Sequence, residues 1–319
     1  MTAFNSADWM QDNLALLGNR KLIDICITGS HDSGMSVVQH GTAGSNACNT
    51  QTQSNDIAGQ LDLGARYFDI RPVIGSGDYY TGHYTKISIP LLGDSMQGSR
   101  GQSIKSIVDQ VNEFTDAHAE LVILNLSHDM DTDAGNSNYP SFNQNQWNGL
   151  FALLSELNHL YMVSSSTNLC QQTLNDFIGK GSASVVVIVE PGSVDLGQYQ
   201  DKGFFPYSSF DVYNSYADTS SFPDMAKDQF AKMDKERAQG NYFLLSWTLT
   251  QGTSEVISCV FSSSAESIRD AATKANNQLQ AQIESHVSPT AYPNILYTDN
   301  IITNQSAQTA MWINQKLSA

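Results

Sequence analysis

The sequence predicts an α/β protein: a TIM-type (βα)8 barrel in which parallel strands alternate with helices. Short apolar runs and amphipathic stretches alternate along the chain, which is typical of parallel β/α units. Two of the apolar runs are almost continuous in Val, Ile and Leu, as in strands buried on both faces of a parallel sheet. The 319 residues contain no Pro/Ser-rich linker and no internal repeat. We therefore expect a single barrel over residues 1–319, a length that one such domain can reach.

Eight apolar runs are predicted as strands, because turn residues bound each of them. In chain order they are residues 22–28, 66–71, 79–83, 121–127, 184–190, 208–212, 242–247 and 294–299. The fourth reads Leu-Val-Ile-Leu-Asn-Leu-Ser and the fifth Ser-Val-Val-Val-Ile-Val-Glu. Eight strands in a chain of this length indicate a closed set rather than an open sheet.

Five amphipathic stretches between these strands are predicted as helices. They are residues 103–117, 147–157, 222–238, 264–286 and 306–317. In the first of them, apolar residues recur at Ile104, Ile107, Val108, Val111 and Phe114. This spacing forms one apolar stripe with the period of an α-helix. Strands separated by such helices run parallel.

The charge balance excludes several kinds of partner. The chain has 16 basic and 32 acidic residues, a formal net charge of −16, and no run of Lys or Arg. Binding to nucleic acid or to a strongly anionic membrane needs a basic stripe, so we expect neither. No apolar run approaches the roughly 20 residues that a spanning helix needs. We expect a soluble or peripheral protein, and a monomer.

Polar composition and cysteine usage bear on location. Only 15% of the residues are charged, and so much uncharged polar surface is typical of a secreted protein. We therefore expect an extracellular protein. Because the first residues show no signal-peptide pattern, the cytoplasm is the alternative. The four cysteines, Cys26, Cys48, Cys170 and Cys259, form no zinc-binding pattern. Cys26 is expected to be a buried thiol, and the polar loop around Cys48 allows a disulfide.

Residues capable of acid–base chemistry follow the carboxyl ends of the predicted strands, where barrel enzymes carry their sites. His31 and Asp32 follow the first strand, Asp69 and Arg71 end the second, and His83 ends the third. Histidine gives or takes a proton near neutral pH, and arginine offers a flat, permanently charged fork to phosphate oxygens. One acid, one base and one fixed cation are what in-line cleavage of a phosphodiester needs.

Each of these residues also has a structural interpretation. His31 lies between glycines in a loop, and an isolated loop histidine is more often structural than catalytic. Asp69 and Arg71 are two apart and share one face of a strand, so they form a salt bridge whether or not they meet a ligand. His83 alone would be interpreted as a loop histidine packed on neighbouring tyrosines. Their occurrence together favours the catalytic interpretation.

Other strand ends carry weaker signals. Ser127 and His128 end the fourth strand, and Asp299 ends the eighth. Asp299 either orients His31 across the closure of the barrel or caps a strand, and His128 either faces the site or lies outside it. The remaining histidines, which are expected to be surface or packing residues, are His40, His118, His159 and His286.

An aromatic run, Phe204-Phe205-Pro206-Tyr207, lies in a polar segment after the fifth strand. Exposed aromatic side chains can insert into a lipid interface. The alternative is that they cover the rim of the barrel. The sequence leaves both open.

The ordered motifs resemble those of a known family. His31-Asp32-Ser33-Gly34, then the segment Gly-Ala-Arg-Tyr-Phe-Asp-Ile-Arg that ends at Arg71, then Gly82-His83, are similar to the catalytic half of bacterial-type phosphatidylinositol-specific phospholipase C and its fungal and bacterial phosphodiesterase relatives. The resemblance is strongest over residues 22–130. It implies a closed or slightly incomplete (βα)8 barrel.

The resemblance also implies roles. His31 would be the general base on the inositol 2-hydroxyl, backed by Asp299, and His83 would be the general acid, partnered by Asp32. Arg71 would bind the phosphate in the space that a calcium ion fills in other members. The expected activity is a metal-independent phosphorus–oxygen lyase that forms a cyclic phosphate, with no cofactor. The implied substrate is a phospholipid or inositol phosphodiester, reached by peripheral contact with a membrane.

The implied substrate site includes Asp69, Ser127, Glu190, Asp211 and Tyr213. Asp211-Val212-Tyr213 is similar to an Asp-x-Tyr that holds the inositol ring in the bacterial enzymes. Ser127 and Glu190 stand where those enzymes have a lysine and an arginine. The headgroup is therefore open: phosphatidylinositol, a glycosylated inositol or another hydroxylated group.

Two other functions remain open from the sequence. One is a metal-dependent phosphodiesterase of the glycerophosphodiester or sphingomyelinase D kind, to which Asp32 and Asp69 would contribute carboxylates. The other is a non-catalytic barrel that binds a polyol phosphate or a glycolipid. Chelator sensitivity separates the first, and binding without turnover separates the second.

Overall fold

Eight parallel strands form a curved central sheet in the computed structural model, which describes residues 4–89, 93–135 and 138–318. From one edge to the other, the strands are β10 (Val212–Tyr213), β11 (Tyr242–Trp247), β12 (Ile295–Thr298), β1 (Ile27–Ser30), β2 (Tyr67–Ile70), β6 (Leu121–Leu126), β8 (Ser184–Val189) and β9 (Phe204–Pro206). Every neighbouring pair is parallel. The predicted α/β architecture is confirmed.

The barrel is incomplete between β9 and β10. Within the described residues these two strands are the edges of the sheet and share no ladder. A 3-10 turn over Tyr207–Ser209 connects them. The incomplete form of the predicted barrel is therefore the one found.

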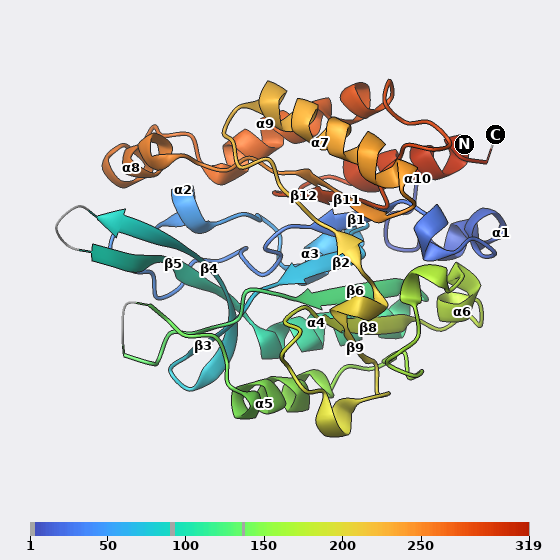
Figure 1. The fold of residues 1–319 in the computed structure, drawn as a ribbon, viewed down its shortest axis with the longest axis horizontal. Coiled ribbons are helices and arrows are strands. Elements are labelled where there is room, and N and C mark those ends of the chain that lie inside the picture. The colour runs from blue at the N-terminus through green and yellow to red at the C-terminus, as the bar shows by residue number, and fades with distance from the viewer. Residues whose placement is uncertain (1–3, 90–92, 136–137, 319) are drawn as a thin grey trace.

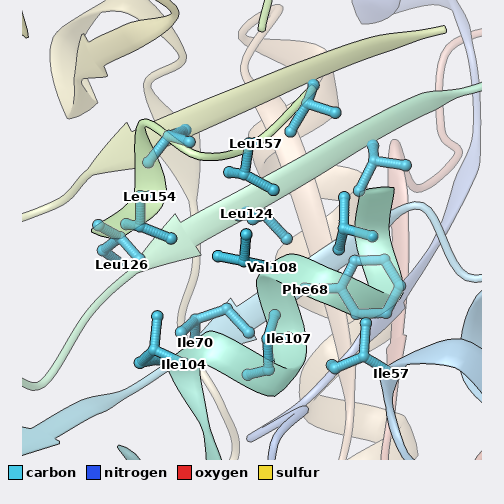
Figure 2. Close-up of a cluster of buried hydrophobic side chains, with 14 of the residues drawn as sticks. Ile57, Phe68, Ile70, Ile104, Ile107, Val108, Leu124, Leu126, Leu154 and Leu157 are labelled. Atoms are coloured by element: carbon cyan, nitrogen blue, oxygen red, sulfur yellow. The ribbon is translucent and has the colours of Figure 1, made fainter. Parts of the chain in front are cut away.

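Helices cover the outside of the sheet in two groups (Figure 1). The first packs over β2, β6 and β8 and consists of α3 (Ile57–Asp62), α4 (Ile104–Ala117) and α5 (Gln144–Leu154). The second packs over β11 and β12 and consists of α7 (Phe222–Ala238), α9 (Ile268–Ile283) and α10 (Gln305–Lys316). Figure 2 shows the first interface, where Phe68 and Leu124 meet Ile107 and Val108 of α4. Burying such apolar faces is what holds the helices on the sheet.

Shorter helices belong to the loops at the two ends of the strands. Two of them, α2 (Ala47–Thr50) and α8 (Thr253–Phe261), follow the carboxyl ends of β1 and β11. α1 (Leu14–Leu17) and α6 (Leu174–Ile178) pack against residues that fill the barrel interior. No helix in the described parts of the chain is long and apolar enough to cross a membrane.

Most predicted elements are confirmed, with shifts of a few residues. α7 has the predicted bounds, and α4 begins one residue late because Ser103 caps it, accepting a hydrogen bond from the Ser106 amide. The first strand was predicted too early: residues 22–24 form a 3-10 turn, and β1 begins at Ile27. The short strand predicted over 208–212 is wrong, because that segment is mostly the turn between β9 and β10.

The predicted third strand is not part of the barrel. Residues 79–83 lie in β4 (Asp78–Ile89), which pairs antiparallel with β3 (Pro72–Gly75) and β5 (Gly93–Ser103) in a second sheet that includes β7 (Met130–Asp131). The reason is a two-residue hairpin turn. Ser76 and Gly77 both have positive φ, 57° and 82°, as a tight hairpin requires.

The aromatic run lies in a strand, and two of the cysteines form a disulfide. Phe204 and Phe205 are fully buried in β9, so of the two alternatives left open, insertion into lipid is wrong. Cys48 of α2 forms a disulfide with Cys259 of α8. Cys26 is a buried thiol, as predicted.

Candidate active site

Sharp turns just beyond three barrel strands shape the mouth of the barrel. Asp32, His128 and Asn300 each lie two residues after a strand and have left-handed φ of 45°, 50° and 50°. Asp, Asn and His tolerate this region better than most residues. In the turn after β1, the Ser33 amide donates a hydrogen bond to the Asp69 carbonyl at 2.9 Å. This bond places His31 and Asp32 over the end of β2.

Close packing of Gly34 joins this turn to β4. A Cβ at Gly34 would lie 2.3 Å from Thr81 Oγ1, so only glycine fits here. The Gly82 amide donates to the Arg71 carbonyl at 3.0 Å, which fixes β4 across the end of β2. His83, predicted at a barrel strand end, thus reaches the same mouth from the second sheet.

His31 is held between a carboxylate and a guanidinium. Its Nδ1 lies 2.7 Å from Asp299 Oδ1, and its Nε2 lies 2.8 Å from Arg71 Nη2. Arginine can only donate, so Nε2 accepts and Nδ1 carries the proton that is donated to Asp299. Burial and Arg71 lower the pKa of His31, but the Asp299 and Asp32 carboxylates together raise it by more, so the net pKa lies above the ordinary 6.5.

His83 forms an ion pair with Asp32, with Nδ1 and Oδ2 2.8 Å apart. Asp32 is fully buried, and Arg71 Nη1 lies 3.4 Å from the same Oδ2. Burial raises the pKa of the Asp32 carboxyl, but the combined effect of Arg71 and His83 is larger and lowers it below the ordinary value, so Asp32 is ionised. The two histidines therefore each have their own carboxylate.

Arg71 lies between the two histidine–carboxylate pairs. Its Nε donates to Asp69 Oδ2 at 2.9 Å. Together with the contacts to Asp32 and His31, this hydrogen bond fixes the guanidinium plane. Burial opposes the charge, but Asp32 and Asp69 raise the pKa of Arg71 above its ordinary value. The side chain stays partly open, at 18% exposure, so its remaining donors can meet a ligand.

Asp69 and Ser127 are hydrogen-bonded to each other, and Asp69 also contacts Arg71. Asp69 accepts from Ser127 Oγ at 2.6 Å and from the Tyr297 hydroxyl at 2.7 Å, in addition to Arg71. Both Asp69 and Ser127 are buried. Against the effect of burial, Arg71 holds the pKa of Asp69 well below its usual range. Their oxygens are thus occupied by protein partners, and contact of Asp69 and Ser127 with substrate stays a prediction.

Asp211 and Tyr213 do not lie at the mouth. β10 pairs Tyr213 with Phe243, near the amino-terminal start of β11, and the Tyr213 ring stacks on Phe243 against the outer helices. Asp211 is exposed one residue before β10. The expectation fails because an Asp-x-Tyr is too short a pattern to fix its height along a barrel strand.

Two residues of the site were missed from the sequence. Tyr297 donates to Asp69, and its ring lies 5.2 Å from that of His31. Asn125 donates from Nδ2 to Glu190 at 3.0 Å. Strand alternation could have found both, because each lies two residues before a residue that was singled out, Asp299 and Ser127.

The other histidines lie where surface or packing residues were expected. His118 pairs with Asp8 and His159 with Asp116, and His286 stacks on Phe230. His40 is exposed. His128 lies beside the site, with Nδ1 2.9 Å from Ser127 Oγ.

Metal-binding side chains are not gathered at this mouth. In residues 4–89, 93–135 and 138–318, no group of three or more His, Cys, Asp or Glu side chains is arranged to hold a metal ion. The carboxylates of Asp32 and Asp69 instead converge on Arg71.

Comparison with solved structures shows that the chain shares its fold with bacterial phosphatidylinositol-specific phospholipases C. A double mutant of the phosphatidylinositol-specific phospholipase C from Staphylococcus aureus superimposes with a TM-score of 0.64 at 17% identity, covering 96% of this chain and 97% of that one. The phosphatidylinositol-specific phospholipase C from Listeria monocytogenes gives 0.62 at 18% identity, covering 97% and 98%. No family model and no curated protein matches the chain. The chain thus shares the whole fold of these structures.

Proposed function

We propose that this protein is a phospholipase C-like phosphorus–oxygen lyase that cleaves a phosphoinositide-type phosphodiester through a cyclic phosphate, without a metal ion. The observation that carries the proposal is the arrangement of His31–Asp299 and His83–Asp32 on the two sides of Arg71. A base, an acid and a cation between them match the needs of intramolecular phosphoryl transfer. The shared fold with bacterial phosphatidylinositol-specific phospholipases C supports the same conclusion.

The first step uses His31 as base. In the structure, His31 Nε2 accepts a hydrogen bond from Arg71. A bound phosphate would draw the Arg71 guanidinium toward its own oxygens and so free this nitrogen. Nε2 then takes the proton of the substrate hydroxyl next to the phosphodiester, and that oxygen attacks phosphorus. Asp299 holds the tautomer and stabilises the resulting imidazolium, while Arg71 balances the charge that develops on the phosphoryl oxygens.

The second half of the step uses His83 as acid. The bond between phosphorus and the lipid oxygen breaks, and protonated His83 delivers its proton to that oxygen. Asp32, kept ionised by Arg71 and His83, lies 2.8 Å from His83 Nδ1 and orients the imidazole. The products are a cyclic phosphate and an alcohol, and a proton transfer from His31 to His83 through solvent resets the site.

Two features support an extracellular enzyme at a lipid surface. The Cys48–Cys259 disulfide is typical of proteins from oxidising compartments. α8, beside the mouth, exposes Ile257, Val260 and 84% of Phe261, and a cluster of exposed apolar side chains marks an interaction site. α8 takes the place of Phe204 and Phe205 as the lipid-contacting segment of this proposal.

Phosphorus NMR of the protein with phosphatidylinositol micelles, with and without EDTA, tests the proposal. We expect a resonance of a five-membered cyclic phosphate that EDTA leaves unchanged. Loss of turnover with EDTA and rescue by calcium or magnesium would favour a metal-dependent phosphodiesterase. Saturable binding with no turnover of any inositol phosphodiester would favour a binding protein.

Substitution of either histidine gives the matching test. We expect His31→Ala and His83→Ala each to lower kcat by at least about 10²-fold, the usual range for loss of a general acid or base, with folding intact. Both side chains are partly exposed, so their loss leaves no buried cavity. Activity of either variant within tenfold of wild type would contradict the mechanism.

A further inference from the structure

Glu190 lies inside the barrel, just beyond the carboxyl end of β8. Along this strand, Val186 and Ile188 belong to the cluster that fills the interior, whereas Val185, Val187 and Val189 face the outer helices. The amide of Glu190 still donates to the Leu126 carbonyl at 3.0 Å. The alternation of side chains therefore continues to Glu190 and directs it inward.

The surroundings of Glu190 agree with this position. Asn125 belongs to the inward-facing set of β6 and donates from Nδ2 to Glu190 Oε2 at 3.0 Å. Burial is the main cause that raises the pKa of the Tyr67 and Tyr207 phenols. The nearby charge of Glu190 also contributes to both. Glu190 is thus a second carboxylate of the interior wall besides Asp69, and it lies outside the ion pairs of Arg71.

This corner of the mouth has polar capacity that the described residues leave unused. The Oδ1 of Asn125 has no hydrogen-bond partner there, although the residue is only 2% exposed. Asn125 gives Glu190 a neutral partner, and within the described chain no Lys, Arg or His lies within ion-pair distance of Glu190. A buried acceptor and an unpaired carboxylate side by side form a site for a group that carries several N–H donors.

The charges elsewhere at the mouth are already matched. Arg71 is shared by Asp32 and Asp69, and each histidine has its own carboxylate. Glu190 is the carboxylate left over. A substrate that brought only its phosphate anion would add another negative charge beside it, whereas one with a nearby cation would pair with it.

We propose that Glu190 and Asn125 select a headgroup that carries a protonated primary amine, such as an amino sugar linked to the inositol ring. The proposal rests on the function proposed above and names the substrate class of the same site. The ammonium group would donate to the Glu190 carboxylate and to Asn125 Oδ1. A hydroxyl in its place makes a neutral hydrogen bond, and charge-assisted bonds are roughly twice as strong.

Two lipids that differ only in this charge provide the test. Glucosaminyl-phosphatidylinositol has a free amine, and N-acetylglucosaminyl-phosphatidylinositol has an amide in its place. In mixed micelles, we expect the wild-type kcat/KM for the first to exceed that for the second by at least about tenfold, as a charge-assisted bond warrants. Glu190→Gln keeps the shape and removes the charge, so its ratio should fall to about twofold or less.

Glu113→Gln is the matched control. It is the same substitution on the exposed surface of α4, so it removes one of the protein's negative charges away from the mouth. If attraction by the net charge of −16 caused the preference, both variants would lower the ratio alike, and the assignment to Glu190 would fail. Melting curves of both variants check that each is folded.

Other outcomes separate this inference from the proposed function. Equal turnover of both lipids by wild type would overturn the role of Glu190 and leave the lyase intact. A ratio that Glu190→Gln does not change would do the same. No cyclic phosphate from either lipid or from phosphatidylinositol would overturn both proposals together.

Discussion

The pH dependence of activity should follow the protonation of His31 most directly. Asp299 raises its pKa against the effects of burial and Arg71, and a base works only while it is unprotonated. Activity should therefore fall as pH decreases through this raised pKa. In Asp299→Asn, the pKa of His31 drops, so the acidic limb of kcat/KM should move to lower pH.

The same variant should lose about 10²- to 10⁴-fold in kcat at neutral pH, because the amide no longer fixes the tautomer or stabilises the imidazolium. Profiles of kcat/KM between about pH 4 and 9 on a soluble inositol phosphodiester would measure both effects. An acidic limb that stays in place in Asp299→Asn would show that another group, not His31, is the base.

At the residue scale, the sequence predicted the reactive groups better than their supports. His31, Asp32 and Arg71 follow the ends of barrel strands, whereas His83 lies within β4, and the structure brings all four together. Which side chains face the ligand depends on tertiary contacts that no motif contains. Asp69, for example, uses its oxygens on Arg71, Ser127 and Tyr297, which the sequence alone could not show.

Among the elements, periodicity predicted the parallel sheet and its helices, because buried strands and amphipathic helices have distinct patterns. It failed where a local turn decided the pairing. The Ser76-Gly77 turn folds β4 back on β3 and makes a second sheet from what resembled a barrel strand. Four-residue helices such as α2 are too short to show a period.

The contact between the β1 turn and β4 gives an element-scale prediction. In Gly34→Ala, the new Cβ would overlap Thr81 and push Asp32 away from His83. We expect a loss of roughly 1–3 kcal/mol of stability, which is typical of overpacking, and a clear drop in kcat. Removing the facing side chain in Gly34→Ala/Thr81→Gly should restore part of kcat.

Thermal melting and kcat of the single and double variants would measure this prediction. If Gly34→Ala retained wild-type kcat, the contact would not control the Asp32–His83 pair. If the double variant were no better than the single one, the clash would lie elsewhere.

Helix α8 gives a second element-scale prediction. Phe261 is 84% exposed, so Phe261→Ser should leave the melting temperature within about 2 °C of wild type, as for most surface substitutions. It should weaken binding to vesicles by several-fold, since an aromatic side chain inserted at the interface is lost. Turnover of a soluble substrate should not change.

Met162→Ser is its control. Met162 is also exposed, at 67%, but lies near the amino-terminal start of β8, at the end of the barrel opposite the mouth. Vesicle sedimentation of both variants should show an effect for Phe261 alone. Equal loss in both would mean that binding has no preferred face.

On the scale of the whole molecule, one covalent bond joins segments that are far apart in sequence. The Cys48–Cys259 disulfide spans 211 residues and ties α2, which follows β1, to α8, which follows β11 (Figure 1). The open edge between β9 and β10 leaves the barrel without a closed ring of strand ladders. The disulfide therefore connects two loops at the mouth. Strand-to-strand hydrogen bonds alone do not close the barrel within the described residues.

Removing this bond should destabilise the whole protein. A cross-link over a long loop restricts the unfolded chain, and its loss typically costs 2–5 kcal/mol, so Cys48→Ser/Cys259→Ser should melt about 5–15 °C lower. Dithiothreitol should lower the melting temperature of wild type toward that of the double variant, and should not affect the variant. Cys26 and Cys170 are buried thiols, so the reductant has no other disulfide to break in the described chain. If wild type melted alike with and without reductant while the variant melted lower, the loss would come from the serine side chains and not from the cross-link.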